Sequence, residues 1–463
     1  MLEEQGPKEL REPARRLPVY RECDVVVLGG GPAGIAAAAA AARLGCSTLL
    51  VERYGFLGGM GTAAGVTNFC GFYASVRGEH RQVVFGVGQE LLERMARLGG
   101  LTRPHLSLGR RILAQAYDVA VYKIAADQLL LSKGVELLFH ALGVGVVMRD
   151  AATADALVVE TKSGRLAIRG RVFVDCSGDG DLCAWAGALY EKGRGPGELL
   201  YPTTMFRVGR VDPQRAGRAW ELIPSLMEEA ERHGHRFSQR APIVRPQKNP
   251  TEWRVNFTQI RNPDGSPVDG TDVRQLSYAE VEGRRQVWEV FEFLREWVPG
   301  FEGAYLVDIP PQVGIRETRR VVGEYQLSEE DVLSCAQFPD AVGVNGWPVE
   351  EHVLGTVRIR WPPEDARGFN QLPYRMLLPK GLANVLVAGR CASMTHGGQS
   401  AARVSGPCFV MGEAAGTAAA LALRKGVAPR ELPVRELQGQ LEVQGAYLGY
   451  GEPAGPPVEA VDR

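Results

Sequence analysis

The chain lacks the features that several broad function classes require. Its 53 basic residues nearly balance its 54 acidic ones, so a net charge of −1 gives no global field to attract nucleic acid or an anionic membrane. None of its eight cysteines forms a C-x-x-C pair, so a dithiol relay, a zinc ribbon and an iron–sulfur cluster all lack their spacing, and we expect no metal site. Residues 1–20 are charged and have no apolar core, so we expect no secretory signal. Scattered thiols of this kind are typical of a reducing compartment, and we expect a cytoplasmic protein.

Long apolar runs are also scarce. Residues 25–42 carry no charge over 18 positions, a length that suggests a membrane span. However, residues 29–32 (Gly-Gly-Gly-Pro) interrupt this run, and a spanning helix tolerates such a break poorly. The run is better explained as a strand, a turn and a helix, so we expect no membrane span.

Glycine, by contrast, is abundant. It makes up 56 of the 463 residues, about 12%, against a usual ~7%. No G-x-y period runs through the chain, which excludes collagen, and a hydrophobic content of 45% excludes bulk disorder. The glycines must therefore act locally.

One glycine cluster lies inside a β-α-β pattern. Residues 24–28 predict a buried strand, residues 29–34 form a G-x-G-x-x-G motif, and the Ala-rich segment 35–44 predicts a helix. A second strand is expected at 47–51, directly before Glu52. This unit of about 29 residues has the length and order of a dinucleotide-binding fingerprint.

Each part of the motif has a physical reason. Gly29 permits the tight turn, Gly31 lets a pyrophosphate approach the backbone at a helix N-terminus, and Gly34 lets helix and strand pack closely. Glu52 can accept hydrogen bonds from a ribose diol. The alternative is a glycine-rich turn that binds nothing, which the full strand–motif–helix–strand–Glu context disfavours.

Two further features favour FAD over NAD. A second glycine-rich stretch, residues 53–62, follows the second strand and suits a bulky isoalloxazine lying against backbone. A late strand at 384–388 ends in Gly389-Arg390 and leads to a helix beginning near Val404, whose dipole could stabilise negative charge on a reduced flavin.

The remaining pattern predicts an α/β fold: a Rossmann-like FAD-binding domain with a parallel sheet and a three-stranded meander. The expected elements are a helix at 118–132, a parallel strand at 134–139, meander strands at 144–148, 156–161 and 165–168, and a separate buried strand at 172–175.

Composition also divides the chain into domains. Residues 191–379 hold 18 of the 29 prolines and show mixed strand and helix patterns. We therefore predict a discontinuous FAD-binding domain of residues 20–190 and 380–426, interrupted by an inserted α+β substrate or cap domain at 191–379. An N-terminal extension (1–19) and a C-terminal tail (427–463) flank it.

Four blocks of the sequence resemble the FAD-dependent oxidoreductase family, the broad bacterial group with the glutathione-reductase-type FAD-binding fold. The blocks are residues 24–61, 174–182, 314–325 and 386–416, and the resemblance covers about residues 20–450. In the last block the family often has Glu-Ala after its histidine, whereas His396 here precedes two glycines.

The resemblance implies a set of cofactor contacts. FAD is expected to touch Gly29, Gly31, Pro32, Ala33, Gly34, Glu52, Arg53, Gly58, Gly59 and Met60, with Gly178 and Asp179 near the dinucleotide and Gly389 and Arg390 beside its ribityl–pyrophosphate part.

Groups for the substrate are expected between the flavin and the inserted domain. The candidates are His396, Arg316, Arg319, Arg320, Tyr374 and Arg403. Of these, we take His396, Arg316 and Arg403 as candidate catalytic residues. His396, with an ordinary pKa near ~6.5, could act as acid or base, or it could be a loop histidine bonded to backbone. The three arginines at 316–320 could clamp a carboxylate, or they could pair with Glu317 and Glu324.

The sequence thus predicts an FAD-dependent oxidoreductase that exchanges a hydride between flavin N5 and a small organic substrate. No second fingerprint stands in a strand–helix context, so an external partner or oxygen is expected to complete the cycle. A flavin monooxygenase or non-redox flavoenzyme is one alternative, and an electron-transfer flavoprotein subunit of a complex is another. The identity of the substrate and the oligomeric state have no signature in the sequence.

Overall fold

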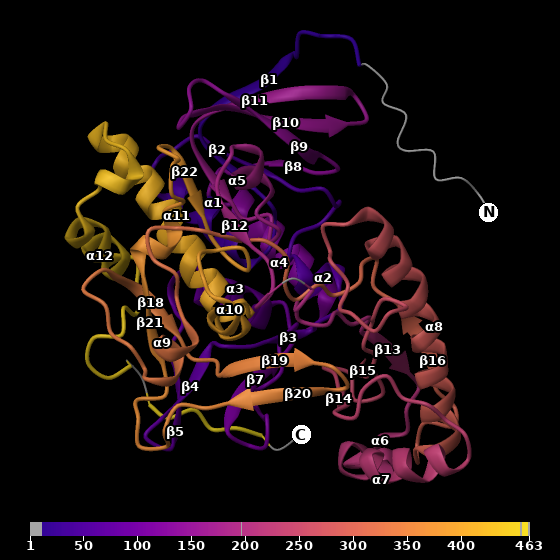
Figure 1. Cartoon of the computed structure of the whole chain (residues 1–463). Coiled ribbons are helices and arrows are strands. Elements are labelled where there is room, and N and C mark those ends of the chain that lie inside the picture. Colours follow the sequence, from indigo (N-terminus) through magenta and orange to yellow (C-terminus); the bar gives the residue numbers. More distant parts are fainter. Residues whose placement is uncertain (1–11, 196, 454–455, 462–463) are drawn as a thin grey trace.

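The central element is a seven-stranded sheet, seen at the top of Figure 1. The computed structural model describes residues 12–195, 197–453 and 456–461, so residues 1–11 of the predicted extension lie outside it. The sheet order is β8 (Glu136–Leu138), β2 (Thr48–Val51), β1 (Val19–Leu28), β11 (Gly164–Asp175), β10 (Ala154–Thr161) and β9 (Leu142–Met148), and β22 (Val385–Val387) also pairs with β11.

The strand β11 corrects one expectation. The predicted meander strand at 165–168 and the separate strand at 172–175 form one continuous strand of 12 residues. They merge because β1 runs parallel to β11 along both halves, with Arg21 opposite Ile168 and Val25 opposite Val172. The first half of β11 also pairs antiparallel with β10, and the second half pairs parallel with β22.

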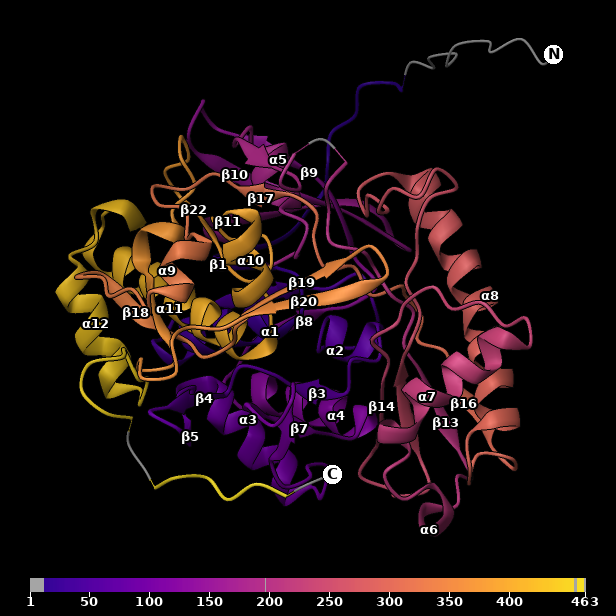
Figure 2. The ribbon, with the colours of Figure 1, turned by 60° about the horizontal axis from the view of Figure 1, so that its bottom comes forward.

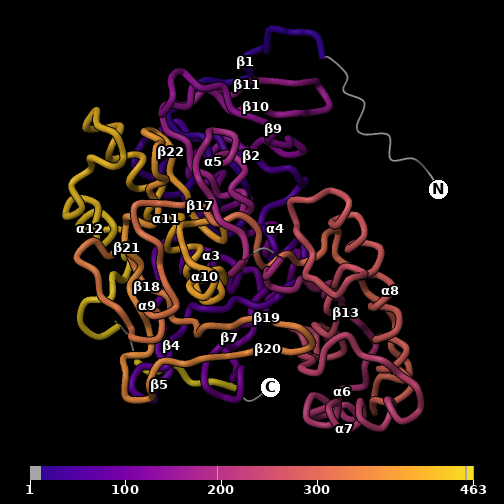
Figure 3. Tube along the Cα trace, in the orientation of Figure 1, coloured from indigo at the N-terminus to yellow at the C-terminus, as the bar shows by residue number. Residues whose placement is uncertain are grey.

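Two long helices from opposite ends of the chain pack beside this sheet. They are α1 (Pro32–Arg43) and α11 (Ser405–Lys425), which pack against each other. Figure 1 labels both helices near β22, and Figure 3 shows α11 beside β22. The approach is close because α11 presents small residues: a Cβ at Gly412 would lie 2.0 Å from the Ala33 carbonyl oxygen, and one at Gly416 2.1 Å from that of Ala37. This contact brings residues near 400 back to the turn that follows β1.

In the described residues, α11 is long and apolar enough to cross a membrane by length and composition alone. However, 89% of its most apolar window is buried inside the protein, as in the core helix of a globular domain.

A second sheet lies on the other side of the molecule, at the right of Figure 1. Its order is β14 (Ile243–Pro246), β15 (Trp253–Asn256), β13 (Phe206–Gly209) and β16 (Tyr305–Asp308), and α7 (Ala219–Arg232) and α8 (Val273–Trp297) accompany it. The buried apolar residues here form their own cluster, from Phe206 to Ala304, distinct from the main core. The domain boundaries given above stay a prediction.

A hairpin connects the two halves. Strands β19 (Val349–Val353) and β20 (Thr356–Arg360) run from the α10–α11 side toward the second sheet, as both Figure 1 and Figure 2 show. The backbone N–H of Tyr201 donates to the His352 carbonyl at 3.0 Å, and that of Arg240 donates to the Gly355 carbonyl at 2.9 Å. The hairpin therefore fixes one half of the protein against the other.

Shorter elements complete the described fold. The helices are α2 (Met60–Ala63), α3 (Gly86–Arg97), α4 (Val119–Leu131), α5 (Asp181–Trp185), α6 (Pro213–Ala216), α9 (Glu329–Leu333), α10 (His396–Ala402), α12 (Val434–Val443), η1 (Tyr374–Leu377) and η2 (Pro429–Glu431). The strands are β3 (Asn68–Phe69), β4 (Tyr73–Val76), β5 (Glu79–Gln82), β6 (His105–Ser107), β7 (Ile112–Ala116), β12 (Tyr190–Glu191), β17 (Arg320–Val321), β18 (Ala341–Asn345) and β21 (Asn370–Pro373).

Candidate active site

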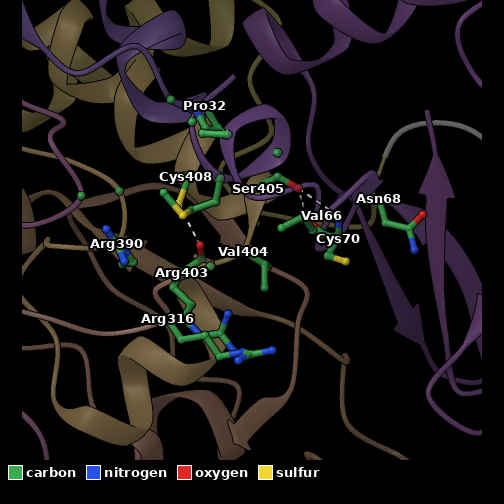
Figure 4. A pocket seen from close by; sticks show the side chains of 18 of the residues that line it. Pro32, Val66, Asn68, Cys70, Arg316, Arg390, Arg403, Val404, Ser405 and Cys408 are labelled. Atoms are coloured by element: carbon green, nitrogen blue, oxygen red, sulfur yellow. Dashed lines mark hydrogen bonds between the residues drawn. The ribbon is translucent and has the colours of Figure 1, made fainter. Parts of the chain in front are cut away.

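One continuous cavity lies between the fingerprint turn and the second sheet (Figure 4). Its first wall consists of the turn after β1, the segment 52–70, residues 176–178 after β11, and residues 389–390 after β22. Its second wall includes residues from β14, β15 and β19. The carboxyl ends of parallel strands thus open into the cavity, where ligands of such sheets bind.

The fingerprint turn has the geometry of an anion cradle. Gly29 has φ of +101°, and a Cβ at Gly34 would lie only 1.8 Å from the Gly29 carbonyl oxygen. At Gly31 the situation differs: a Cβ there would meet only the Cα of Gly59, at 3.6 Å, and would otherwise project into open space. Helix α1 begins at this point with no side-chain cap, so its first N–H groups are available to an anion.

Glu52 supports this turn from the end of β2. Its Oε2 accepts from the Gly30 N–H at 2.7 Å and its Oε1 from the Tyr54 N–H at 2.9 Å. Burial outweighs these bonds and raises the pKa of Glu52. The side chain lines the cavity, and each carboxylate oxygen has a further lone pair for a ligand hydroxyl.

Most residues expected to contact FAD line this cavity: Gly29, Gly31, Pro32, Ala33, Glu52, Arg53, Gly59, Met60, Gly178, Gly389 and Arg390. The other three stand behind the wall. Gly34 packs on Gly29, the Gly58 N–H donates to the Gly30 carbonyl at 2.8 Å, and Asp179 accepts from Arg390 at 2.8 Å. Their roles toward the cofactor stay predictions.

A buried hydroxyl also points to a ligand here. The hydroxyl of Tyr122 is buried and has no hydrogen-bond partner in the described part of the chain. Tyr122 lines the cavity beside Gly61, where a Cβ would lie 3.1 Å from the tyrosine ring. Because buried polar atoms are normally satisfied, this hydroxyl suits a ligand that brings the missing partner.

The second wall carries a buried ionic group. Arg254 on β15, Arg316 in the segment before β17 and Arg403 after α10 all line the cavity together with Glu350 and His352 of β19. Figure 4 shows Arg316 and Arg403 side by side, with Arg390 apart from them. These groups come from four separate segments of the chain.

Their pKa values reflect burial among like charges. Burial and then the charge of Arg403 lower the pKa of Arg316 to about 9. Burial and the charge of Arg316 lower the pKa of His352 to about 3, so this imidazole is neutral. Burial opposes ionisation of Glu350, but a hydrogen bond from His352, the charge of Arg403 and a bond from Trp347 outweigh it and lower its pKa to about 2.

Comparison with known proteins identifies the family. Residues 24–441 match the family model described as FAD dependent oxidoreductase. The chain belongs to this family. Its cofactor is FAD, and the glycine cradle, Glu52 and the unpartnered Tyr122 hydroxyl fit that group.

Other likenesses are more local or more remote. Over 45 residues the chain is 53% identical to dihydrolipoyl dehydrogenase of Trypanosoma brucei brucei, which is 10% of this chain and 9% of that protein. The match therefore spans less than a tenth of this curated relative.

Solved structures of flavoenzymes also align. The p-nitrophenol 4-monooxygenase of Pseudomonas putida DLL-E4 is 13% identical with a TM-score of 0.48, covering 94% of this chain and 91% of that one. A myxobacterial chondrochloren halogenase is 15% identical with a TM-score of 0.43, covering 91% and 78%. A geranylgeranyl bacteriochlorophyll reductase-like protein of Thermoplasma acidophilum is 13% identical with a TM-score of 0.44, covering 92% and 84%.

In this FAD-dependent oxidoreductase, His396 does not line the cavity. It lies buried at the start of α10, with Nδ1 2.9 Å from Glu317 Oε2 and Nε2 3.5 Å from Glu351 Oε1. Its partners are thus carboxylates rather than the backbone, and its part in catalysis stays a prediction.

The arginines at 316–320 diverge. Arg316 lines the cavity, Arg319 contacts Asp181 at 2.8 Å, and Arg320 pairs with the buried Glu317. Glu324, the other partner considered, pairs instead with Arg430. The Tyr374 hydroxyl donates to the Pro429 carbonyl at 2.8 Å, away from the cavity lining.

Sequence reasoning missed Arg254, Glu350 and His352. A signal existed for the last two, because residues two apart on a strand share a face. Glu350 and His352 face the cavity from β19, whereas Glu351 between them faces His396. In the sequence Val-Glu-Glu-His-Val of residues 349–353, the alternation of a strand places Glu350 and His352 on one face and Glu351 on the other, and this could have been predicted.

Proposed function

We propose that the protein transfers a hydride between FAD and a small organic substrate held in the cavity. The observation that carries this is the continuity of the cavity, which joins the fingerprint turn to a wall of buried side chains from β15, β19 and the α10–α11 junction. When bound, FAD supplies the group that accepts or donates the hydride.

The residues of the chain have distinct tasks in this proposal. The N–H groups at the start of α1 bind the pyrophosphate, and Glu52 receives hydroxyls of the ribose. Apolar side chains that line the cavity, among them Phe69, Met205 and Trp347, exclude water from the reacting atoms. The polar groups beside them orient the substrate.

We also propose that oxygen or an external carrier completes the cycle, and that the protein is cytoplasmic. The second proposal is supported by the cysteines, because all eight are free thiols.

The test is an anaerobic substrate screen on the purified holoenzyme. Bleaching of the visible flavin band by a small organic molecule, with recovery of a two-electron product, is the expected result. Reduction only by a protein partner would favour the electron-transfer subunit instead. Bleaching that needs an added reduced nicotinamide, followed by oxygen insertion into the substrate once O2 is readmitted, would favour the monooxygenase.

A further inference from the structure

The second wall of the cavity holds more buried positive charge than the protein neutralises. Arg254 is 5% exposed and Arg316 8% exposed, and the Arg403 side chain is 13% exposed. Among the described residues, Glu350 supplies the only carboxylate that lines this wall of the cavity. Three guanidinium groups therefore share one carboxylate.

That carboxylate is largely committed to other donors. Its Oε2 accepts from Trp347 Nε1 at 2.9 Å, and its Oε1 lies 3.5 Å from His352 Nε2. The closest approach of Arg403 to a Glu350 carboxylate oxygen is 4.0 Å. Glu350 thus reduces the local field without forming a close ion pair with an arginine of this wall.

The arginines have few other acceptors. Arg316 donates to the Tyr201 carbonyl at 2.5 Å, and Arg403 donates to the Glu350 backbone carbonyl at 3.4 Å. Arg254 donates to the Val66 carbonyl at 2.9 Å and to the Asn68 side-chain oxygen at 3.1 Å. The Nε atoms of Arg254 and Arg403 are buried and have no hydrogen-bond partner within the described ranges. Unpaired buried charge is costly, so a cavity built this way suits an anion that enters from outside.

Two arginines outside the cavity wall, the buried Arg320 and the partly buried Arg207, do have acidic partners. Arg320 pairs with Glu317, and Arg207 forms a two-pronged contact with Asp308 at 2.9 and 3.1 Å. Burial of an arginine in this protein therefore does not by itself entail a shortage of acidic partners.

We propose that Arg254, Arg316 and Arg403 form a subsite for the carboxylate of an organic acid, which is the substrate class of the proposed oxidoreductase. The planar guanidinium fork matches a carboxylate. The apolar side chains around the subsite, including Val66, Ile243 and Met205, suit the carbon body of such an acid better than a fully hydrated inorganic anion. That the bound acid is the substrate rests on the proposed function; that the cavity binds a carboxylate does not.

The test measures binding without turnover. Acetate and benzoate are titrated into the FAD-bound protein by calorimetry and by difference spectra of the flavin, with acetamide, benzamide and inorganic phosphate as comparisons. We expect at least one carboxylate to bind roughly 10- to 100-fold more tightly than its uncharged amide, because the amide lacks the negative charge and the second acceptor oxygen of the carboxylate.

Variants locate the site. Arg316→Met is expected to weaken carboxylate binding by about 10- to 100-fold, and Arg316→Lys by less, because it keeps the charge and loses the fork. Arg207→Met removes a partly buried arginine that forms an ion pair with Asp308, and should leave carboxylate binding unchanged. FAD content and melting temperature verify folding, and Arg254→Met replaces Arg316→Met if the latter does not fold.

Several results would overturn the subsite. These are equal binding of acid and amide, no binding of either carboxylate, phosphate binding more tightly than both, or Arg316→Met and Arg207→Met behaving alike. The proposed function fails separately, if no small molecule bleaches the flavin while carboxylates still bind through Arg316.

Discussion

Gly31 offers a substitution that separates cofactor binding from folding. Its φ is −75° and its ψ −175°, an extended conformation that alanine adopts without strain. An added Cβ would meet only the Cα of Gly59 at 3.6 Å, and it would project into the cavity where the pyrophosphate is expected. Gly31→Ala should therefore leave the apoprotein folded and impair FAD binding.

The magnitudes follow from this geometry. Replacing glycine by alanine at a compatible backbone conformation stabilises a protein by about 0.4–1 kcal/mol, so the apoprotein should unfold at the same or a slightly higher urea concentration. Displacing the pyrophosphate by a methyl group sacrifices one charge-assisted hydrogen bond, roughly 1.5–3 kcal/mol, or about 10- to 150-fold in the Kd of FAD.

The matched control is Gly34→Ala, three residues along the same turn. There the Cβ would lie 1.8 Å from the Gly29 carbonyl oxygen, a backbone atom that cannot move aside cheaply. This variant should lose stability of the apoprotein itself, by about 1–3 kcal/mol or more. Urea unfolding of both apoproteins and fluorescence titration with FAD distinguish the two effects. If Gly31→Ala binds FAD as the parent does, the pyrophosphate does not lie against this residue.

Three further predictions test the buried titratable groups, and the third has a matched control. Burial raises the pKa of Glu413 from 4.5 to about 7, so the free energy of unfolding decreases by on the order of 3 kcal/mol as the pH rises from 4.5 through 7. Glu413→Gln should therefore have a higher melting temperature than the parent at pH 8 but not at pH 4. Burial holds the pKa of His352 near 3, against an ordinary value of 6.5, so the free energy of unfolding falls as the pH drops below 6.5, by roughly 2 kcal/mol at pH 5. Urea unfolding of His352→Gln at pH 7 and pH 5 should lack this loss. If the variant loses as much stability between the two pH values as the parent, His352 is not the cause. Glu317→Gln should lower the free energy of unfolding in urea by about 3–5 kcal/mol, because it leaves Arg320 and its neighbours without a buried carboxylate. Glu324→Gln, in an exposed pair, should lower it by less than about 1 kcal/mol. Similar losses for the two variants would refute the difference in burial as the cause.

The β-α-β unit was predictable because its information is local. Residues 24–52 contain the strand, the turn, the helix and the second strand in sequence, and the structure has β1, α1 and β2 at these places. The continuity of β11 was not predictable, because it depends on the partner strand: β1 is long enough to pair with both halves. The apolar pattern of one strand contains no information about the length of the strand that pairs with it.

The arginines at 316–320 show why side-chain placement needed the fold. Three cations within five residues suggest one clamp, but the backbone before β17 is neither a helix nor an extended strand with a regular face. Arg316 therefore points to the cavity, Arg319 to Asp181 and Arg320 to Glu317. The residues that join Arg316 in the cavity wall are instead Arg254 of β15 and Arg403, which follows α10. Nothing near these three residues in the sequence connects them.

The two walls of the cavity thus follow different rules. The cofactor wall is specified mainly by backbone: its small residues, most of them within residues 29–61, must leave space for the dinucleotide, so substitution there is constrained whatever the reaction. The opposite wall is specified by side chains from four separate segments, and replacing Arg254, Arg316 or Arg403 would change the charge of that wall without moving the turn at Gly31. A fold of this kind can keep its cofactor while its substrate changes. The family therefore accounts for FAD, and the charge of the arginine wall is the property of this chain from which its substrate is to be inferred.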